Sequence, residues 1–400
     1  MPLIDIWRSN PDSIKSYAIR QVLAIAGDGR IRDESSCANE LRAYLRETTS
    51  EKLTAYALEC LEDSFEDSGF VLQDVVNEIG RRLEFDVENG RYRGRQGTEG
   101  FDGIWRVESD QAIIVEVKTT DSYNARLDHV AEYRSSLIKN GRVPPDASIL
   151  FVVGRKDTGA LEAQIRGSRH AWDMRVCGTD SLVKLMRVKE KSTEESTIKQ
   201  IRELLRPFEY TRIDRIVDVV FDTAADVEQS SEAAVGEDIG IAETRDASHR
   251  TSERTNPSDI DVMRDRIVVA LQKKLGVALV RRRRAMFEDI RGRNRACISI
   301  SKRYNREYQP YWYAYHPAWN EFLECADDAL FVLGCMDRDE AFAIPLSVFS
   351  GFLPKLNQTV RDDGARYWHV VITTNNDGKL ALYSSRTGDK LDLQTFALPL

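Results

Sequence analysis

The segment GFDGIWRVESDQAIIVEVKTT, residues 100–120, has two runs of strand-forming residues on either side of a short polar stretch. This arrangement predicts an antiparallel hairpin that turns at residues 108–110. Residues paired across a turn centred on residue 109 have numbers that sum to 218, so the prediction places Asp102 opposite Glu116. The pairing determines where the charged side chains of this segment meet.

Side chains alternate between the two faces of a strand, so Glu116 and Lys118 share one face, while the valines on either side of Glu116 can enter a core. Two carboxylates at cross-strand distance repel each other unless a cation lies between them, and oxygen ligands suit Mg²⁺ or Mn²⁺. We therefore expect Asp102, Glu116 and the Val117 carbonyl to bind a divalent ion beside Lys118. The alternative is an exposed salt bridge between Glu116 and Lys118, with Asp102 capping a turn.

The flanking sequence predicts a layered α/β domain. Apolar residues four apart (Val71, Val75, Ile79 and Leu83) form one helix face before the hairpin. After it we expect a helix at 125–140, an apolar strand at 148–153, a helix from 158 to about 172 and a strand near 174–177. The predicted order is helix, three strands, helix, strand, helix, strand, which favours a sheet covered by helices.

The chain of 400 residues is long enough for more than one domain. Residues 1–66 have helical spacing and predict a helical N-terminal region, and 67–224 form the sheet-containing domain. Residues 225–259 have no aromatic side chain and are rich in acids, which predicts a disordered linker. Residues 260–400 contain strand-like segments and short helical ones, and predict a separate α+β domain.

The composition excludes several classes of protein. No apolar run approaches the roughly 18 residues of a membrane span, and the N-terminus lacks the pattern of a secretion signal, so we expect a cytoplasmic protein without a membrane partner. The six cysteines form no CxxC pair, which argues against a structural zinc site. The net charge of −8 hides local basic patches.

The hairpin resembles the signature of the PD-(D/E)XK nuclease superfamily, in which an aspartate on one strand precedes a (D/E)-x-K triplet on the next. Asp102 matches the first position and Glu116, Val117 and Lys118 match the triplet, whereas Phe101 stands where the motif has proline. The resemblance implies a restriction-endonuclease-like core with a Mg²⁺ (or Mn²⁺) site. It also implies an assisting acid on the preceding helix, Glu78, and a polar residue on a later helix, Gln164.

Basic residues accompany this motif. The period-two side chains of Arg91, Arg93 and Arg95 suit phosphate contact, or else protect a strand edge. Arg166 and Arg169 follow on a predicted helix, and the neighbouring His170 is either a packing or hydrogen-bonding residue or a phosphate contact. Residues 273–306 hold twelve Lys or Arg and two acids, densest at Arg281, Arg282, Arg283 and Arg284, which predicts nucleic-acid binding or a solvated helix face.

The aromatic strands of the C-terminal part predict a core, with a base-stacking pocket as the alternative. Taken together, the patterns and the resemblance favour a Mg²⁺-dependent DNA endonuclease of the restriction or phage-defence kind, similar to Mrr-like members of the superfamily. We expect it to act on duplex DNA as a homodimer or higher homo-oligomer. Two alternatives remain: a repair or RNA-directed nuclease with the same site, and a non-catalytic nucleic-acid-binding protein on a nuclease scaffold.

Overall fold

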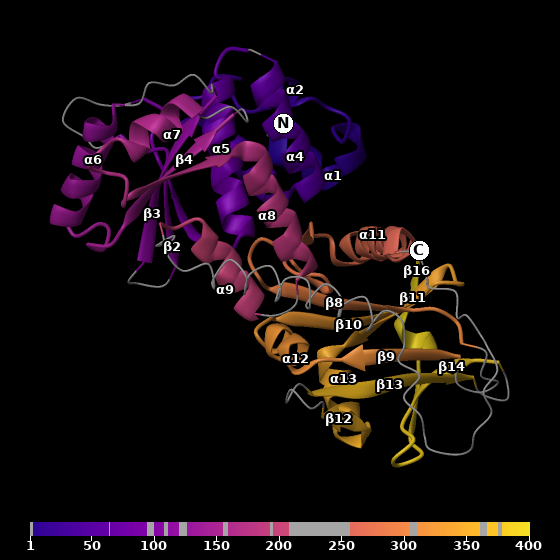
Figure 1. Cartoon of the computed structure of the whole chain (residues 1–400). Helices are drawn as coiled ribbons and strands as arrows, with labels where there is room; N and C mark the ends of the chain where they lie inside the picture. Colours follow the sequence, from indigo (N-terminus) through magenta and orange to yellow (C-terminus); the bar gives the residue numbers. More distant parts are fainter. Residues whose placement is uncertain are drawn as a thin grey trace, which may run out of the picture. The chain divides into compact units, whose positions relative to one another are not determined.

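The computed structural model divides the chain into two compact units, residues 1–223 and 224–400 (Figure 1). Each unit is described by itself. The structure describes residues 3–63, 65–93, 100–107, 111–119, 126–154, 159–192, 195–207, 257–304, 310–360, 366–374 and 378–400. Both units are mixed structures in which helices pack against sheets.

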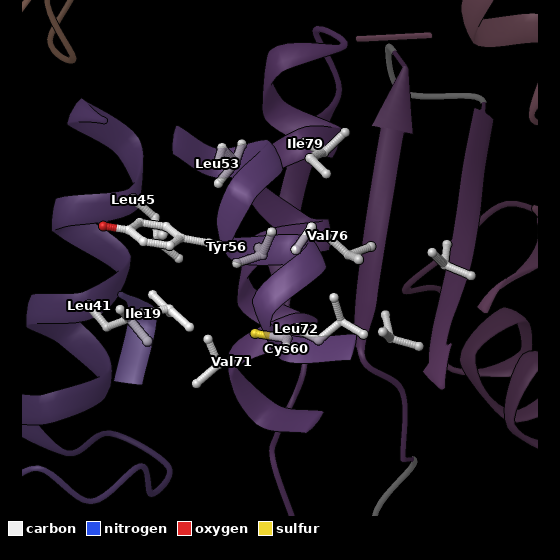
Figure 2. Packing of buried hydrophobic residues seen from close by; sticks show 14 of the residues in the cluster. Ile19, Leu41, Leu45, Leu53, Tyr56, Cys60, Val71, Leu72, Val76 and Ile79 are labelled. Carbon is white, nitrogen blue, oxygen red and sulfur yellow. The ribbon is translucent and has the colours of Figure 1, made fainter. Parts of the chain in front are cut away.

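Unit 1 begins with a helical layer, as the spacing of residues 1–66 predicts. Its α3 and α4 each begin after a capping side chain, since Ser35 accepts from the Ala38 amide and Thr49 from the Lys52 amide. The layer does not form a core of its own, because its apolar side chains pack onto α5 in one continuous cluster (Figure 2). The elements are α1 (Leu3–Ser9), η1 (Pro11–Ser13), α2 (Ile19–Ile25), α3 (Ser36–Glu47), α4 (Ser50–Glu62) and α5 (Ser68–Arg82).

A five-stranded sheet follows, in the order β1-β2-β3-β4-β5, with the first three strands antiparallel and the last three parallel. The predicted element order is confirmed. The predicted register is confirmed too, because Gly103 pairs with Val115 and Ile104 with Ile114. The strands are β1 (Asp86–Asn89), β2 (Gly103–Val107), β3 (Gln111–Lys118), β4 (Ser148–Val153) and β5 (Met174–Gly178), and the helices are α6 (Leu127–Lys139), α7 (Gly159–Arg166), α8 (Thr179–Lys191) and α9 (Glu195–Leu204).

The two faces of β3 enter different cores. Ile113, Val115 and Val117 pack with the helical layer and α5, whereas Ile114 packs with apolar side chains of α6 and α7. Glu116 and Lys118 share the face of Ile114 by the alternation of the strand. The helix predicted from 158 to about 172 is shorter than expected: α7 ends at Arg166, directly before Gly167.

Unit 2 contains α11 and two sheets, with apolar clusters on both faces of the first sheet. The first sheet has the order β16-β11-β10-β8-β7-β6 and the second β12-β13-β14-β15, with β9 paired to β13. The helices are α11 (Pro257–Leu275), α12 (Pro317–Glu324), η2 (Leu353–Lys355), α13 (Leu346–Phe352) and η3 (Gln394–Phe396). The strands are β6 (Val280–Arg281), β7 (Met286–Glu288), β8 (Asn294–Ser301), β9 (Tyr311–Tyr315), β10 (Asp328–Cys335), β11 (Glu340–Pro345), β12 (Gln358–Val360), β13 (Arg366–Thr374), β14 (Leu380–Tyr383), β15 (Lys390–Asp392) and β16 (Ala397–Pro399).

The linker prediction is wrong at its C-terminal end, because α11 begins at Pro257 and residues 257–259 are helical. A proline at the first helical position suits this start, and the apolar side chains of Ile260 and Met263 anchor it. Residues 225–256 lie outside the described part of the chain. Within the described residues, no helix combines the length and the apolar character that crossing a bilayer requires.

Most of the predicted aromatic core of unit 2 is confirmed, since Tyr311, Tyr313, Tyr315, Trp319 and Tyr367 are buried. Trp312 and Trp368 are half-buried.

Candidate active site

Asp102 lies directly before β2. The observed strand pairing ends at Gly103, which lies opposite Val115, so the pairing of Asp102 with Glu116 stays a prediction. The amide of Asp102 donates to the same Val115 carbonyl at 3.0 Å. Its Oδ2 accepts a hydrogen bond from the Val117 amide at 2.6 Å. The carboxylate of Asp102 is therefore held against the end of β3 by the backbone of the (D/E)-x-K triplet itself.

The three central groups of the prediction converge. Lys118 Nζ lies 3.1 Å from Glu116 Oε2 and 3.9 Å from Asp102 Oδ2. The exposed fractions of the side chains are 20% for Asp102, 9% for Glu116 and 26% for Lys118. This cluster of two acids and one amine is thus largely removed from water, which argues against the alternative of an exposed salt bridge on a strand surface.

Burial makes both acids reluctant to ionise, and the repulsion from Asp102 adds to this effect at Glu116. Burial raises the pKa of Asp102, and the Lys118 charge and the Val117 amide oppose the shift. Burial, followed by the repulsion from Asp102, raises the pKa of Glu116 to about 7, against the opposing charge of Lys118. A second cation placed between the carboxylates would relieve both the desolvation and the repulsion.

The residues present fit a hard divalent ion. Asp102 and Glu116 offer carboxylate oxygens, which Mg²⁺ and Mn²⁺ prefer. The Val115 carbonyl points toward β2, and the carbonyl of Val117, two residues further along the strand, has the same orientation by strand geometry. Across the described part of the chain no cluster of three His, Cys, Asp or Glu side chains suitable for a metal occurs. A small ion held here would therefore keep several water ligands, as Mg²⁺ usually does.

Two amide side chains of α5 support this site, and the sequence did not reveal them. Gln73 Nε2 and Asn77 Nδ2 donate to the Asp102 carbonyl oxygen at 3.1 and 2.8 Å. Asn77 Oδ1 also accepts from Trp105 Nε1 at 2.9 Å. The approach is close, since a Cβ at Gly103 would lie 2.2 Å from Asn77 Oδ1. These buried contacts fix the backbone from which the Asp102 carboxylate extends.

Glu78 forms ion pairs with two arginines of its own helix, whereas the resemblance implied that it assists Asp102 and Glu116. Its Oε1 accepts from Arg82 Nε at 3.0 Å, and its Oε2 lies 3.4 Å from Arg81 Nη1. Arg82 is itself buried and donates to the Thr48 carbonyl at 2.8 Å. The reason is its direction on α5: Glu78 follows Asn77 by one residue, and successive side chains are about 100° apart around an α-helix. Its ion pair ties α5 to the helical layer.

A tyrosine of α6 lies beside the site. The hydroxyl of Tyr133 would be 3.4 Å from a Cβ at Gly100, two residues before Asp102. His129 Nε2 lies 3.1 Å from the same hydroxyl. The two residues are four apart, so they share a helix face, and this spacing is the signal by which the sequence could have revealed them.

The other predicted residues of unit 1 lie on α7 or shortly after it. Gln164 is half-buried on α7, between Leu161 and Ile165, which pack into the core shared with Ile114. Arg166 is 77% exposed and lies 3.8 Å from Glu162. Arg169 and His170 both contact Asp128 Oδ1, at 2.9 Å each, so His170 takes part in an ion-pair cluster.

The alternation predicted for the arginines before the hairpin is confirmed where the structure describes it. Arg91 and Arg93 are exposed on either side of the buried Tyr92. Arg95 lies outside the described residues. Tyr92 donates to the buried carboxylate of Asp74, which anchors this arginine-bearing segment to α5.

The four consecutive arginines of unit 2 lie at β6 and in the turn before β7, not on a helix. Arg281 Nη2 is 3.6 Å from Asp261 Oδ1, and Arg282 Nε is 2.5 Å from Glu288 Oε1. All four arginines, including Arg283 and Arg284, are half-buried. The alternative of a solvated helix face is therefore wrong for this run.

The chain matches no protein-family model, and no curated protein is similar to it. The geometry of Asp102, Glu116 and Lys118 is accordingly the main evidence for a function.

Proposed function

We propose that unit 1 is a divalent-metal-dependent nuclease of the PD-(D/E)XK type that hydrolyses phosphodiester bonds in duplex DNA. The observation that carries the proposal is the meeting of two poorly solvated carboxylates with one lysine, 3.1 and 3.9 Å from them, at the end of a strand pair. The element order around this pair, from α5 to β5, supports a restriction-endonuclease-like core.

Each group has a distinct part in this reaction. Asp102, Glu116 and the Val117 carbonyl would hold the ion, which when bound supplies an activated water and neutralises phosphate charge. Lys118 orients the attacking water or stabilises the charge that develops on the phosphate. Asp102 keeps its position because the Val117 amide holds its Oδ2. Arg91 and Arg93 are exposed and suited to contact backbone phosphates of the DNA.

A role in restriction or phage defence is the setting we propose, on the resemblance to Mrr-like nucleases. A nuclease with one site per chain that cuts both strands of a duplex often works as a dimer, so we expect the active form to be a homodimer or higher homo-oligomer. Unit 2, with its basic run from Arg281 to Arg284, would then bind the same DNA.

The test compares labelled duplex DNA, single-stranded DNA and RNA of one sequence, each with Mg²⁺ or with a chelator, using the purified full chain. We expect cleavage of the duplex that requires Mg²⁺ and falls at least about 100-fold in Lys118→Ala and Asp102→Asn. Lys184→Ala is the matched control, because Lys184 is 72% exposed on α8. It should cleave as the wild type does.

Other outcomes separate the competing functions. Cleavage of RNA alone would contradict the DNA assignment while keeping the site. A wild-type chain that neither cleaves nor binds Mg²⁺ or Mn²⁺ by calorimetry would contradict the enzyme and favour a nucleic-acid-binding protein. Retained turnover in both Lys118→Ala and Asp102→Asn would show that the reaction occurs elsewhere.

A further inference from the structure

Arg264 of α11 is a buried guanidinium in a cationic surrounding. The residue is 5% exposed, and its Nη1 donates to Asp261 Oδ1 at 2.5 Å. Its Nε is buried and donates to no acceptor within the described part of the chain. A buried guanidinium ordinarily has its donors matched, because each unmatched donor costs free energy. Arg264 therefore has hydrogen-bonding capacity that the described residues leave unused.

The charged side chains nearest to Arg264 also favour the binding of an anion. Arg281 Nη2 lies 3.6 Å from the same Asp261 Oδ1, so two guanidinium groups share one carboxylate oxygen. Burial, followed by the repulsion from Arg281, lowers the pKa of Arg264 to about 10, with Arg284 acting in the same direction and Asp261 and Asp265 opposing. The shared carboxylate is 49% exposed, so water weakens its compensation of the buried charge.

We propose that Arg264, Arg281 and Arg284 form a phosphate-binding site, in which Asp261 is the internal competitor that the phosphate displaces. A phosphate group offers several acceptor oxygens and at least one negative charge, and planar guanidinium groups match it bidentately. The half-exposed Asp261 marks the side from which a phosphate reaches Arg264. The site is formed by α11 and β6 with the turn that follows it, and it lies within unit 2.

The phosphate comes either from a nucleic-acid backbone or from a free nucleotide. As a DNA contact the site deepens the proposed function and rests on it. Phosphate binding itself requires nothing from Asp102, Glu116 or Lys118. All binding measurements are therefore made with a chelator present, so that a failure here is distinguishable from a failure of the nuclease assignment.

The experiment measures binding of inorganic phosphate by calorimetry at low ionic strength, with the full chain and two matched pairs of variants. Arg281→Gln is compared with Arg266→Gln, which removes an equal charge from α11 at a residue paired with Asp339. Asp261→Asn is compared with Asp339→Asn. We expect about tenfold weaker binding in Arg281→Gln, unchanged binding in Arg266→Gln, and several-fold tighter binding in Asp261→Asn but not in Asp339→Asn.

Equal losses in Arg281→Gln and Arg266→Gln, or no saturable binding by the wild type, would overturn the site. Arg264→Gln is left out of the decisive set because a substitution at so buried a position affects folding. Two further probes identify the source of the phosphate. If a short duplex competes with inorganic phosphate, and the variants affect duplex binding as they affect phosphate binding, the phosphate comes from the DNA backbone. If AMP binds more tightly than phosphate and the duplex does not compete, the phosphate comes from a nucleotide.

Discussion

Replacing Glu116 by glutamine should change how the stability of unit 1 depends on pH. Burial, and then the nearby Asp102, raises the pKa of this carboxyl from the ordinary 4.5 to about 7. Because the folded-state pKa lies above that of the unfolded chain, the carboxyl favours folding when protonated. Its contribution is fully present below about pH 4.5 and is lost as the pH rises through 7. The difference corresponds to on the order of 3 kcal/mol, at about 1.4 kcal/mol for each pH unit.

The assay is urea unfolding of the wild type and Glu116→Gln between pH 5 and 8 with a chelator present. Glutamine cannot ionise, so the variant lacks this pH dependence while keeping the size of the side chain. We expect its free energy of unfolding, relative to the wild type, to rise by up to about 3 kcal/mol over this range. Mg²⁺ at pH 8 should then stabilise the wild type and have little effect on the variant.

Glu162→Gln is the control, because Glu162 is half-exposed on α7. Its unfolding curve should follow that of the wild type at every pH. If the curves of wild type and Glu116→Gln stay parallel from pH 5 to 8, Glu116 is an ordinary carboxylate and the reasoning from burial and repulsion is refuted.

Three further predictions test the surroundings of the site. Asn77→Ala should destabilise unit 1 by about 1–3 kcal/mol and reduce cleavage, since the buried Trp105 indole loses its acceptor; urea unfolding and a cleavage assay check both. Glu78→Gln should lower the free energy of unfolding by about 3–5 kcal/mol, because it leaves the buried Arg82 charge unpaired, while cleavage per folded molecule stays unchanged. A loss of cleavage without a loss of stability would instead assign Glu78 to the active site. Charge reversal at residues 281–284 should weaken duplex binding, measured by anisotropy at low salt, without changing Mg²⁺ affinity.

The hairpin and the strand that follows it could be predicted from the sequence because local patterns of residues determine them. In the hairpin, one turn and strict alternation fix both the register and the faces, so the pairing of Gly103 with Val115 followed from residue numbers alone. The strand Ser148–Val153 was predicted at its observed bounds because a short run of large apolar and β-branched residues suits a strand that is buried on both faces. The same register brings Asp102, which precedes Gly103, to the end of β3, where its Oδ2 accepts from the Val117 amide.

Which side chains surround the site depends on how the helices pack in the folded structure, and the periodicity of the sequence does not show this. The apolar spacing of α5 shows that one face packs inward, but not which of the polar side chains beside that face points toward Asp102. For that reason Glu78 was assigned to the site, whereas Gln73 and Asn77, which do contact the Asp102 backbone, were not. Polar residues flanking an apolar stripe look alike in a sequence, and only the packed structure distinguishes them.

The support from α5 explains how two repelling carboxylates remain in place. The Asp102 carbonyl oxygen accepts from Gln73, Asn77 and the Gly90 amide, and the Asp102 amide donates to Val115. With its backbone held on both sides, Asp102 cannot withdraw from Glu116 without breaking buried hydrogen bonds. The repulsion is therefore maintained in the folded chain instead of being relieved by movement. A divalent ion that binds between the carboxylates would relieve this repulsion and would therefore bind more tightly. This is the physical basis for expecting metal binding at a site with so few ligands.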